Sequence, residues 1–164
     1  MSLARTAAGD VATDVVLETF RLNGLLVAAG NRLAAAEGLT AALWQVLGPV
    51  AQAGRPLTVP QIARRMGLTR QAVQASVNRL RSDGLVETRE NLDHRRSPLI
   101  RLTPLGRQSY EALNRRQIRW INELSAGLKL ADLAAAARLL RDLGDRLEMP
   151  AGTGPEGDEN DAAT

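Results

Sequence analysis

Arginine and amide side chains recur at helical spacing in residues 69–82. Arginine donates two parallel hydrogen bonds to guanine, and glutamine or asparagine pairs in the same bidentate way with adenine, on base edges exposed in the DNA major groove. A helix that turns these side chains outward is predicted to read base pairs, while hydroxyl groups and an arginine at its start and flank contact phosphates. The residues expected to bind DNA from this helix are Thr69, Arg70, Gln71, Gln74, Ser76, Asn78 and Arg79.

A second polar cluster lies in residues 91–97. Arg95 and Arg96 fall at the tip of a predicted hairpin, from which an arginine can enter the minor groove, where the negative potential of DNA is focused. Asp93 would repel phosphate, so its predicted role is structural, holding an arginine in position by a charge-assisted hydrogen bond. For both clusters the alternative is a solvated polar surface without a ligand, and no single side chain separates the two interpretations.

The distribution of charge favours a polyanionic partner. The net charge of the chain is only +3, but residues 55–107 hold eleven arginines against four acidic residues, a local net charge of +7. Residues 151–164 hold four acidic residues and no basic one. Because one third of the chain carries the basic excess, DNA is the simplest partner, and a solvated basic face is the alternative.

Two predicted helices position the first polar cluster. Thr58 and Gln61 have the spacing of a capping box at the start of a helix that ends at Gly67, and Thr69 can cap a second helix that ends at Ser82. The short connection at 67–69 forces a large crossing angle between the helices. The apolar residues predicted to pack between them, which turns the polar ones outward, are Ile62, Ala63, Met66, Val73, Val77 and Leu80.

Two short strands are predicted after these helices. Residues 85–89 alternate and are rich in β-formers, and residues 97–102 are the predicted partner, with Pro98 restricting the pairing at one end. The order helix, turn, helix, strand, hairpin, strand predicts a winged helix-turn-helix. The expected fold class is therefore mainly α with a small two- or three-stranded β wing.

Further helices are predicted on both sides of this unit, at 10–36, 40–53, 103–126 and 130–148. Gly48 and Pro49 are expected to interrupt or kink the second of them, because proline removes a backbone donor and clashes with the preceding turn. An apolar stripe from Leu133 to Leu147, together with the first helix, predicts a face that packs against a second copy; packing within one chain is the alternative. The expected division is a dimerisation helix at 10–38, a DNA-binding winged helix-turn-helix at 39–102, dimerisation helices at 103–149 and a disordered acidic tail at 150–164.

Several segments together resemble the MarR family of bacterial transcriptional regulators. The Asp-x-Arg wing and the Leu-Thr-x-x-Gly exit are the more specific parts, since many families share a helix-turn-helix. The resemblance covers about residues 39–106, and Gly48, Pro49 and Pro98 depart from the family pattern. The matching segments are Leu57-Thr58-Val59-Pro60-Gln61-Ile62-Ala63, Gly67-Leu68-Thr69-Arg70-Gln71-Ala72-Val73, Leu80, Asp83-Gly84-Leu85-Val86, Asp93-His94-Arg95-Arg96 and Leu102-Thr103-Pro104-Leu105-Gly106.

The resemblance implies a homodimer whose first, fifth and sixth helices interlock and whose two winged domains bind a pseudo-palindromic double-stranded operator. It implies a pairing of Asp93 with Arg95 in the wing. It also implies a repressor that a small, often aromatic, effector releases from DNA by binding between the dimerisation and DNA-binding regions. The candidate pocket residues are Phe20, Trp44, Tyr110 and Trp120, for which a place in the core is the alternative.

Other function classes find little support. The chain has no cysteine, its one histidine is His94, and it contains no phosphate-binding glycine motif, nucleophile elbow or metal-ligand spacing, so we expect no enzyme, cofactor or metal site. No stretch approaches the roughly 18 apolar residues that span a bilayer, and no signal peptide is evident, so we expect a cytoplasmic protein without a membrane partner. The alternative function is a winged-helix adaptor that binds proteins and not DNA.

Overall fold

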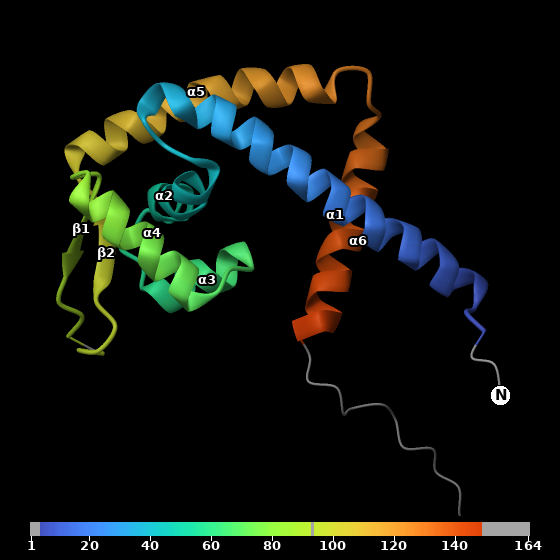
Figure 1. The fold of residues 1–164 in the computed structure, drawn as a ribbon, viewed down its shortest axis with the longest axis horizontal. Helices are drawn as coiled ribbons and strands as arrows, with labels where there is room; N and C mark the ends of the chain where they lie inside the picture. Colours follow the sequence, from blue (N-terminus) through green and yellow to red (C-terminus); the bar gives the residue numbers. More distant parts are fainter. Residues whose placement is uncertain (1–3, 93, 149–164) are drawn as a thin grey trace, which may run out of the picture. The chain divides into compact units, whose positions relative to one another are not determined.

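The computed structural model describes residues 4–92 and 94–148 of the chain, which divides into two compact units, one ending at Ile121 and one beginning at Asn122. The fold is mainly helical with one small antiparallel sheet, as predicted (Figure 1). Asp93 and the acidic tail at 150–164 lie outside the described residues. The elements are α1 (Ala7–Ala34), a 3-10 turn (Ala35–Glu37), α2 (Ala41–Gln52), α3 (Val59–Met66), α4 (Arg70–Ser82), β1 (Val86–Arg89), β2 (Leu99–Leu102), α5 (Pro104–Ser125) and α6 (Leu130–Glu148).

The α1–α2 corner is held by a side chain and by a close helix approach. Gly38 ends the 3-10 turn with φ of 67°, a left-handed conformation that glycine adopts without strain. Asn31 Oδ1 accepts a hydrogen bond of 2.8 Å from the Ala41 amide at the start of α2. A Cβ on Gly30 would lie 3.0 Å from the Ala41 Cβ, so glycine lets α1 lie directly against α2.

The expected interruption of α2 at Gly48 and Pro49 is wrong, because one helix continues through both residues to Gln52. The clash between a proline ring and the residue before it falls partly on that residue's Cβ. Gly48 has no Cβ, which relieves this part of the clash. Both residues are buried in the middle of the first unit.

The helix-turn-helix forms as predicted. The Thr58 amide donates to Gln61 Oε1 at 2.9 Å at the start of α3, and Gly67 ends this helix with φ of 61°. Thr69 Oγ1 accepts from the Ala72 amide at 3.1 Å and so caps α4. Among the apolar residues expected between the helices, Met66 is the exception: it is exposed to 36%, while Ile62, Ala63, Val73, Val77 and Leu80 are buried.

The wing is a two-stranded sheet in which β1 pairs with β2, with Val86 opposite Leu102 and Arg89 opposite Leu99. Strand β2 begins one residue after Pro98, which cannot donate a backbone hydrogen bond. An isolated bridge joins Leu57 to Ile100, with backbone hydrogen bonds of 3.1 and 2.7 Å, and adds a third segment to the sheet. The wing is thereby joined to the segment that leads into α3.

The start of α5 is fixed to the end of the helix-turn-helix by Thr103. Its Oγ1 donates to the Gly84 carbonyl at 2.7 Å and accepts from the Gly106 amide at 3.0 Å. A Cβ on Gly106 would lie 1.9 Å from the carbonyl oxygen of Leu85, so only glycine permits this approach. The Leu-Thr-x-x-Gly segment therefore ties α5 to the end of α4 and the beginning of the wing.

Both terminal regions of the chain expose apolar side chains. Along α1 the exposed apolar residues include Val11, Leu17 and Phe20, and along α6, described by itself, they include Leu133, Leu140 and Leu147. The buried core of the first unit combines residues of α2, α3, α4 and both strands with Ala34 at the end of α1 and Leu113 of α5. Among the described residues, these apolar side chains of α1 and α6 are exposed and lie outside this core.

Candidate nucleic-acid interface

One face of α4 is polar and exposed. Burial of Val73, Val77 and Leu80 fixes the rotation of the helix, because these residues lie at helical spacing on one side. The side chains that sequence reasoning placed on the opposite face are turned to solvent: Thr69, Arg70, Gln71, Gln74, Asn78 and Arg79 are exposed, and Ser76 is half-buried. The polar face of α4 that the sequence predicts to read bases is therefore exposed to solvent.

Two contacts organise this face. Gln74 Nε2 donates to Asn78 Oδ1 at 2.9 Å, so the two amides lie one helical turn apart and in contact. Arg79 Nε forms an ion pair of 2.8 Å with Asp83 Oδ2, so the charges of these two side chains offset each other at the end of the helix. Arg70, at the start of α4, forms no ion pair with any described residue and leaves its guanidinium group available.

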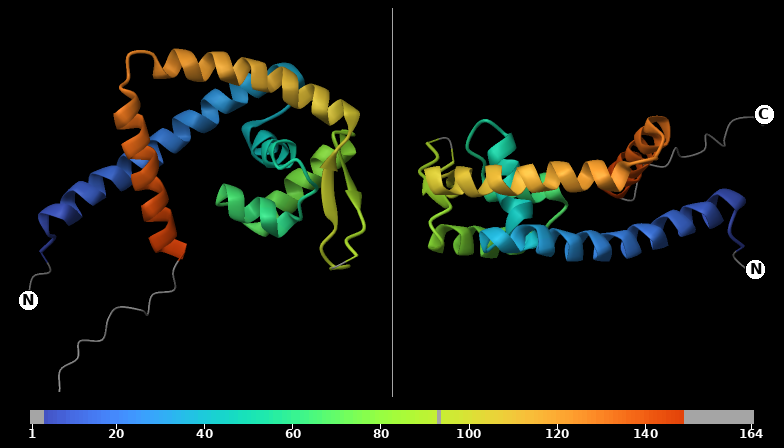
Figure 2. Two further views of the ribbon diagram at one scale, coloured as in Figure 1. Left: turned by 180° about the vertical axis from the view of Figure 1, so that it is seen from behind. Right: turned by 90° about the horizontal axis from the view of Figure 1, so that it is seen from above.

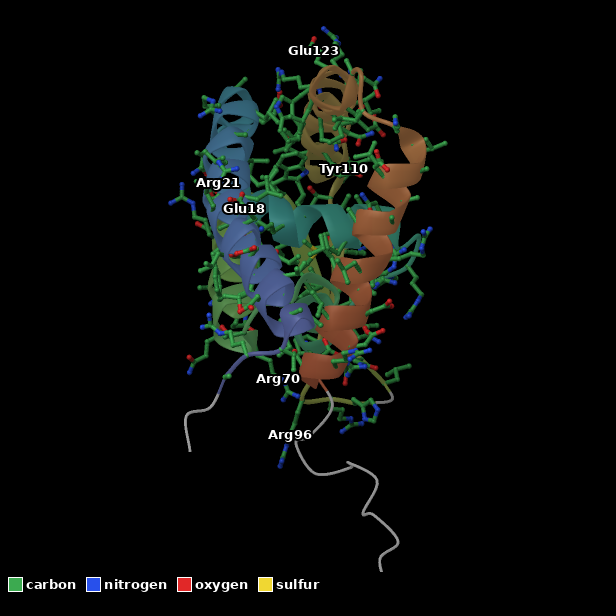
Figure 3. The ribbon with its side chains drawn as sticks, turned by 90° about the vertical axis from the view of Figure 1, so that its right-hand side faces the viewer. Glu18, Arg21, Arg70, Arg96, Tyr110 and Glu123 are labelled. Carbon is green, nitrogen blue, oxygen red and sulfur yellow. The ribbon has the colours of Figure 1, made fainter. Side chains whose placement is uncertain are left out.

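The wing and α4 meet at a groove of about 370 Å³. Arg96 from the wing and Arg70 from the first turn of α4 both line it, and Figure 3 shows the two side chains at the same end of the first unit. Arg96, like Arg70, has no ion-pair partner among residues 4–92 and 94–148. The residues lining the groove are Val59, Pro60, Arg70, Gln71, Gln74, Arg96, Ser97 and Pro98.

The wing tip is held by a residue that sequence reasoning missed. The Asn91 side chain is 7% exposed, its Nδ2 donates to the Ser97 carbonyl at 3.0 Å, and its Oδ1 accepts from the His94 amide at 3.3 Å. Asn91 thereby links the two sides of the loop that carries Arg95 and Arg96. An asparagine at a hairpin base is the only sequence signal, since this side chain readily bonds nearby backbone groups.

The pairing of Asp93 with Arg95 falls on a residue outside the described part of the chain. The partner that the structure gives Arg95 is Glu90, whose Oε1 lies 3.8 Å from Arg95 Nε. Both side chains are mostly exposed, so this contact is weak and easily exchanged for a phosphate.

A second candidate site is a cavity of about 370 Å³ within the first unit, where α2 lies between α1 and α5 (Figure 2, right). Trp44, Tyr110 and Trp120, three of the four predicted pocket residues, line it. Phe20 does not: it is 71% exposed on α1 and is absent from the cavity wall. Gln52 Nε2 donates to Tyr110 Oη at 3.2 Å and so connects α2 with α5 at the cavity.

A family model described as the MarR family matches residues 37–97. An uncharacterized protein of Mycobacterium tuberculosis strain H37Rv is 46% identical over 127 residues, which cover 77% of this chain and 87% of that protein. The chain belongs to the MarR family. The transcriptional activatory protein BadR of Rhodopseudomonas palustris is 26% identical over 148 residues, 88% of this chain and 85% of BadR.

Solved structures of transcriptional regulators, among them the MarR family regulator AbsC, share the fold. AbsC from Streptomyces coelicolor has a TM-score of 0.74 at 17% identity, with 89% of this chain and 98% of AbsC covered. MOSR of M. tuberculosis, in complex with DNA, has a TM-score of 0.68 at 21% identity (82% and 98% covered). PcaV from S. coelicolor, in complex with its natural ligand, has a TM-score of 0.63 at 24% identity (90% and 100% covered).

As a MarR regulator, the chain is a DNA-binding transcriptional regulator and not an enzyme. Within residues 4–92 and 94–148, no cluster of three or more histidine or acidic side chains has the geometry of a metal site. In the same residues no helix combines the length and hydropathy of a membrane span.

Proposed function

We propose that this MarR regulator binds a pseudo-palindromic operator as a homodimer, represses transcription, and is released by a small molecule bound in the cavity between α1, α2 and α5. The observation that carries the DNA-reading part is the groove in which Arg96 of the wing and Arg70 of α4 lie together without ion-pair partners in the described chain. An α4 helix in the major groove would then place the wing beside it, over the adjacent minor groove.

Exposed apolar surface supports the homodimer. Phe20 and Leu17 on α1 and Leu147 on α6 are each at least 60% exposed in a single chain. Such extended apolar surface is usual at a subunit interface. Two-fold symmetry of the dimer would impose a matching symmetry on the operator.

The Thr103 junction supports coupling between effector and DNA. Helix α5 lines the cavity with Tyr110 and Trp120, and its first turn is hydrogen-bonded to the Gly84 carbonyl at the end of α4. An effector that prefers an α5 position incompatible with operator spacing would shift the population away from the DNA-binding state. Repression and release follow from this scheme if the operator overlaps a promoter.

Selection of bound sequences from random DNA tests the operator, and a salt titration then separates a regulator from a protein-binding adaptor. We expect selected sequences with inverted half-sites one helical turn apart, and an affinity that falls steeply with salt because each neutralised phosphate releases counterions. Failure to enrich any sequence would contradict operator binding. A promoter fusion that loses expression when the regulator is supplied distinguishes repression from activation.

A further inference from the structure

The wall of the α1–α2–α5 cavity contains no charged side chain. The chain has 21 lysine and arginine residues and 18 acidic ones, yet none of them is among the described residues that line the cavity. The wall consists of two tryptophans, one tyrosine, apolar residues and amides. The amide side chains are Asn23, Gln45, Gln52, Asn114 and Gln117.

Among the arginines next to lining residues in sequence, Arg116 is partly buried and already paired, whereas Arg32, Arg65, Arg115 and Arg119 are exposed and do not line the cavity. Arg116 precedes the lining residue Gln117, and its Nη1 lies 2.6 Å from Glu37 Oε1 in a partly buried ion pair. Turning Arg116 towards a bound anion would leave the Glu37 carboxylate, which is 18% exposed, without its partner. In the described residues, therefore, no arginine side chain lines the cavity to offset the charge of a bound anion, and the partly buried Arg116 is held by Glu37.

The lining can instead satisfy a neutral polar molecule. Tyr110 Oη accepts from Gln52 Nε2, which leaves the phenol hydrogen free to donate to a ligand oxygen. The amides supply both donors and acceptors, and the two indole rings provide flat apolar contact. Burial of a carboxylate without a counter-charge, in contrast, loses hydration that hydrogen bonds from neutral groups only partly replace.

We infer that the cavity selects an uncharged aromatic ligand with an amide or phenol group over the corresponding carboxylate. This inference rests on the proposed function, in which the cavity is the effector site, and it specifies the charge of the effector. A regulator with this selectivity would respond to a neutral aromatic amide and ignore the carboxylate formed when that amide is hydrolysed with release of ammonia.

Tryptophan fluorescence of the full chain tests the inference with matched probes, benzamide against benzoate and 4-hydroxybenzamide against 4-hydroxybenzoate, at neutral pH. The chain has two tryptophans, Trp44 and Trp120, and both line the cavity, so the signal reports on this site. We expect each amide to bind at least about tenfold more tightly than its acid. Equal or tighter binding of the acids, or no response to any probe, would overturn the inference.

A charge introduced into the wall sharpens the test. Gln117→Arg should reverse the preference in favour of the acids, whereas the uncharged control Gln117→Met should keep the preference for the amides. Unchanged probe selectivity in Gln117→Arg would count against the inference. Operator binding is measured in parallel without probes. If the unmodified protein binds its operator but the probe test fails, only the ligand assignment is rejected. If the unmodified protein does not bind an operator at all, the proposed function itself is rejected.

Discussion

The two candidate sites differ in the placement of charge. The groove between α4 and the wing is lined by Arg70 and Arg96, both exposed and without ion pairs in the described chain, whereas the cavity between α1, α2 and α5 has no charged wall residue. In Figure 3 the labelled Arg70 and Arg96 lie at one end of the first unit and Tyr110 lies away from it. Under the proposed function, a polyanion and a small neutral molecule would bind to separate surfaces of one unit.

This difference in charge would let one small domain bind two unlike partners, DNA and the proposed neutral effector. Exposed arginines remain hydrated until DNA arrives, so their attraction to phosphate acts at long range and depends on salt. The cavity acts at contact distance through shape and hydrogen bonds, which salt screens little. The two sites communicate only if the backbone between them is stiff, and the Thr103–Gly106 junction is the candidate connection.

The largest effect on stability should come from Gly106→Ala, which places a side chain in this junction. The new Cβ would collide with the Leu85 carbonyl oxygen, and backbone on both sides must move. We expect a loss of unfolding free energy of about 2–4 kcal/mol, with DNA and ligand binding weakened together. Urea denaturation measures the change in unfolding free energy. Gly144→Ala is the matched control: a Cβ added there in α6 meets no atom within 4 Å outside its own helix backbone, so the substitution should change stability by about 1 kcal/mol or less.

Arg96→Ala should weaken operator binding without changing ligand binding in the cavity. Removal of this unpaired wing arginine should weaken operator binding by about 1–3 kcal/mol and reduce the salt dependence, because one DNA contact is lost. Probe binding in the cavity should not change. Fluorescence anisotropy with labelled operator measures the first quantity, and Arg115→Ala, an exposed arginine of α5 outside the groove, is the control. A change in probe affinity would show that the two sites are not separate.

A smaller effect is expected from Asn91→Ala. The substitution removes the hydrogen bonds to the Ser97 carbonyl and the His94 amide, so the wing tip is no longer held in one conformation. Operator affinity should fall several-fold, about 1 kcal/mol, while cavity binding stays constant. Leu92→Ala, at an 84% exposed neighbour, should leave operator affinity unchanged. If Asn91→Ala binds DNA as well as the unmodified protein, the wing does not need this support.

The sequence was sufficient to predict elements whose signals are local. Thr69 and Gly67 set the ends of α3 and α4 through capping and a left-handed glycine, which depend on neighbours in the chain. The outward polar face of α4 followed from helical periodicity alone. The helix at 40–53 was predicted, but its passage through Pro49 without an interruption was not, since the relief that Gly48 gives depends on a helix held by the surrounding core.

Features that join distant segments were harder to predict. Periodicity cannot show that Arg96 lies in one groove with Arg70, because this depends on how the wing packs against α4. For the same reason it cannot show that Met66 lines the cavity and is not buried in the core. Of the aromatic residues grouped by type as pocket candidates, Trp44, Tyr110 and Trp120 line the cavity, whereas Phe20 lies exposed on α1. Residue type alone does not distinguish a cavity wall from an exposed helix face.

The most direct test of the account is the base preference of Arg70→Ala on the selected operator, measured with every single-base substitution in one half-site. If α4 reads bases through Arg70, the variant should lose discrimination at one base pair, by about 1–3 kcal/mol, and keep it at the others. Full retention of the discrimination pattern of the unmodified protein would contradict base reading by this face of α4.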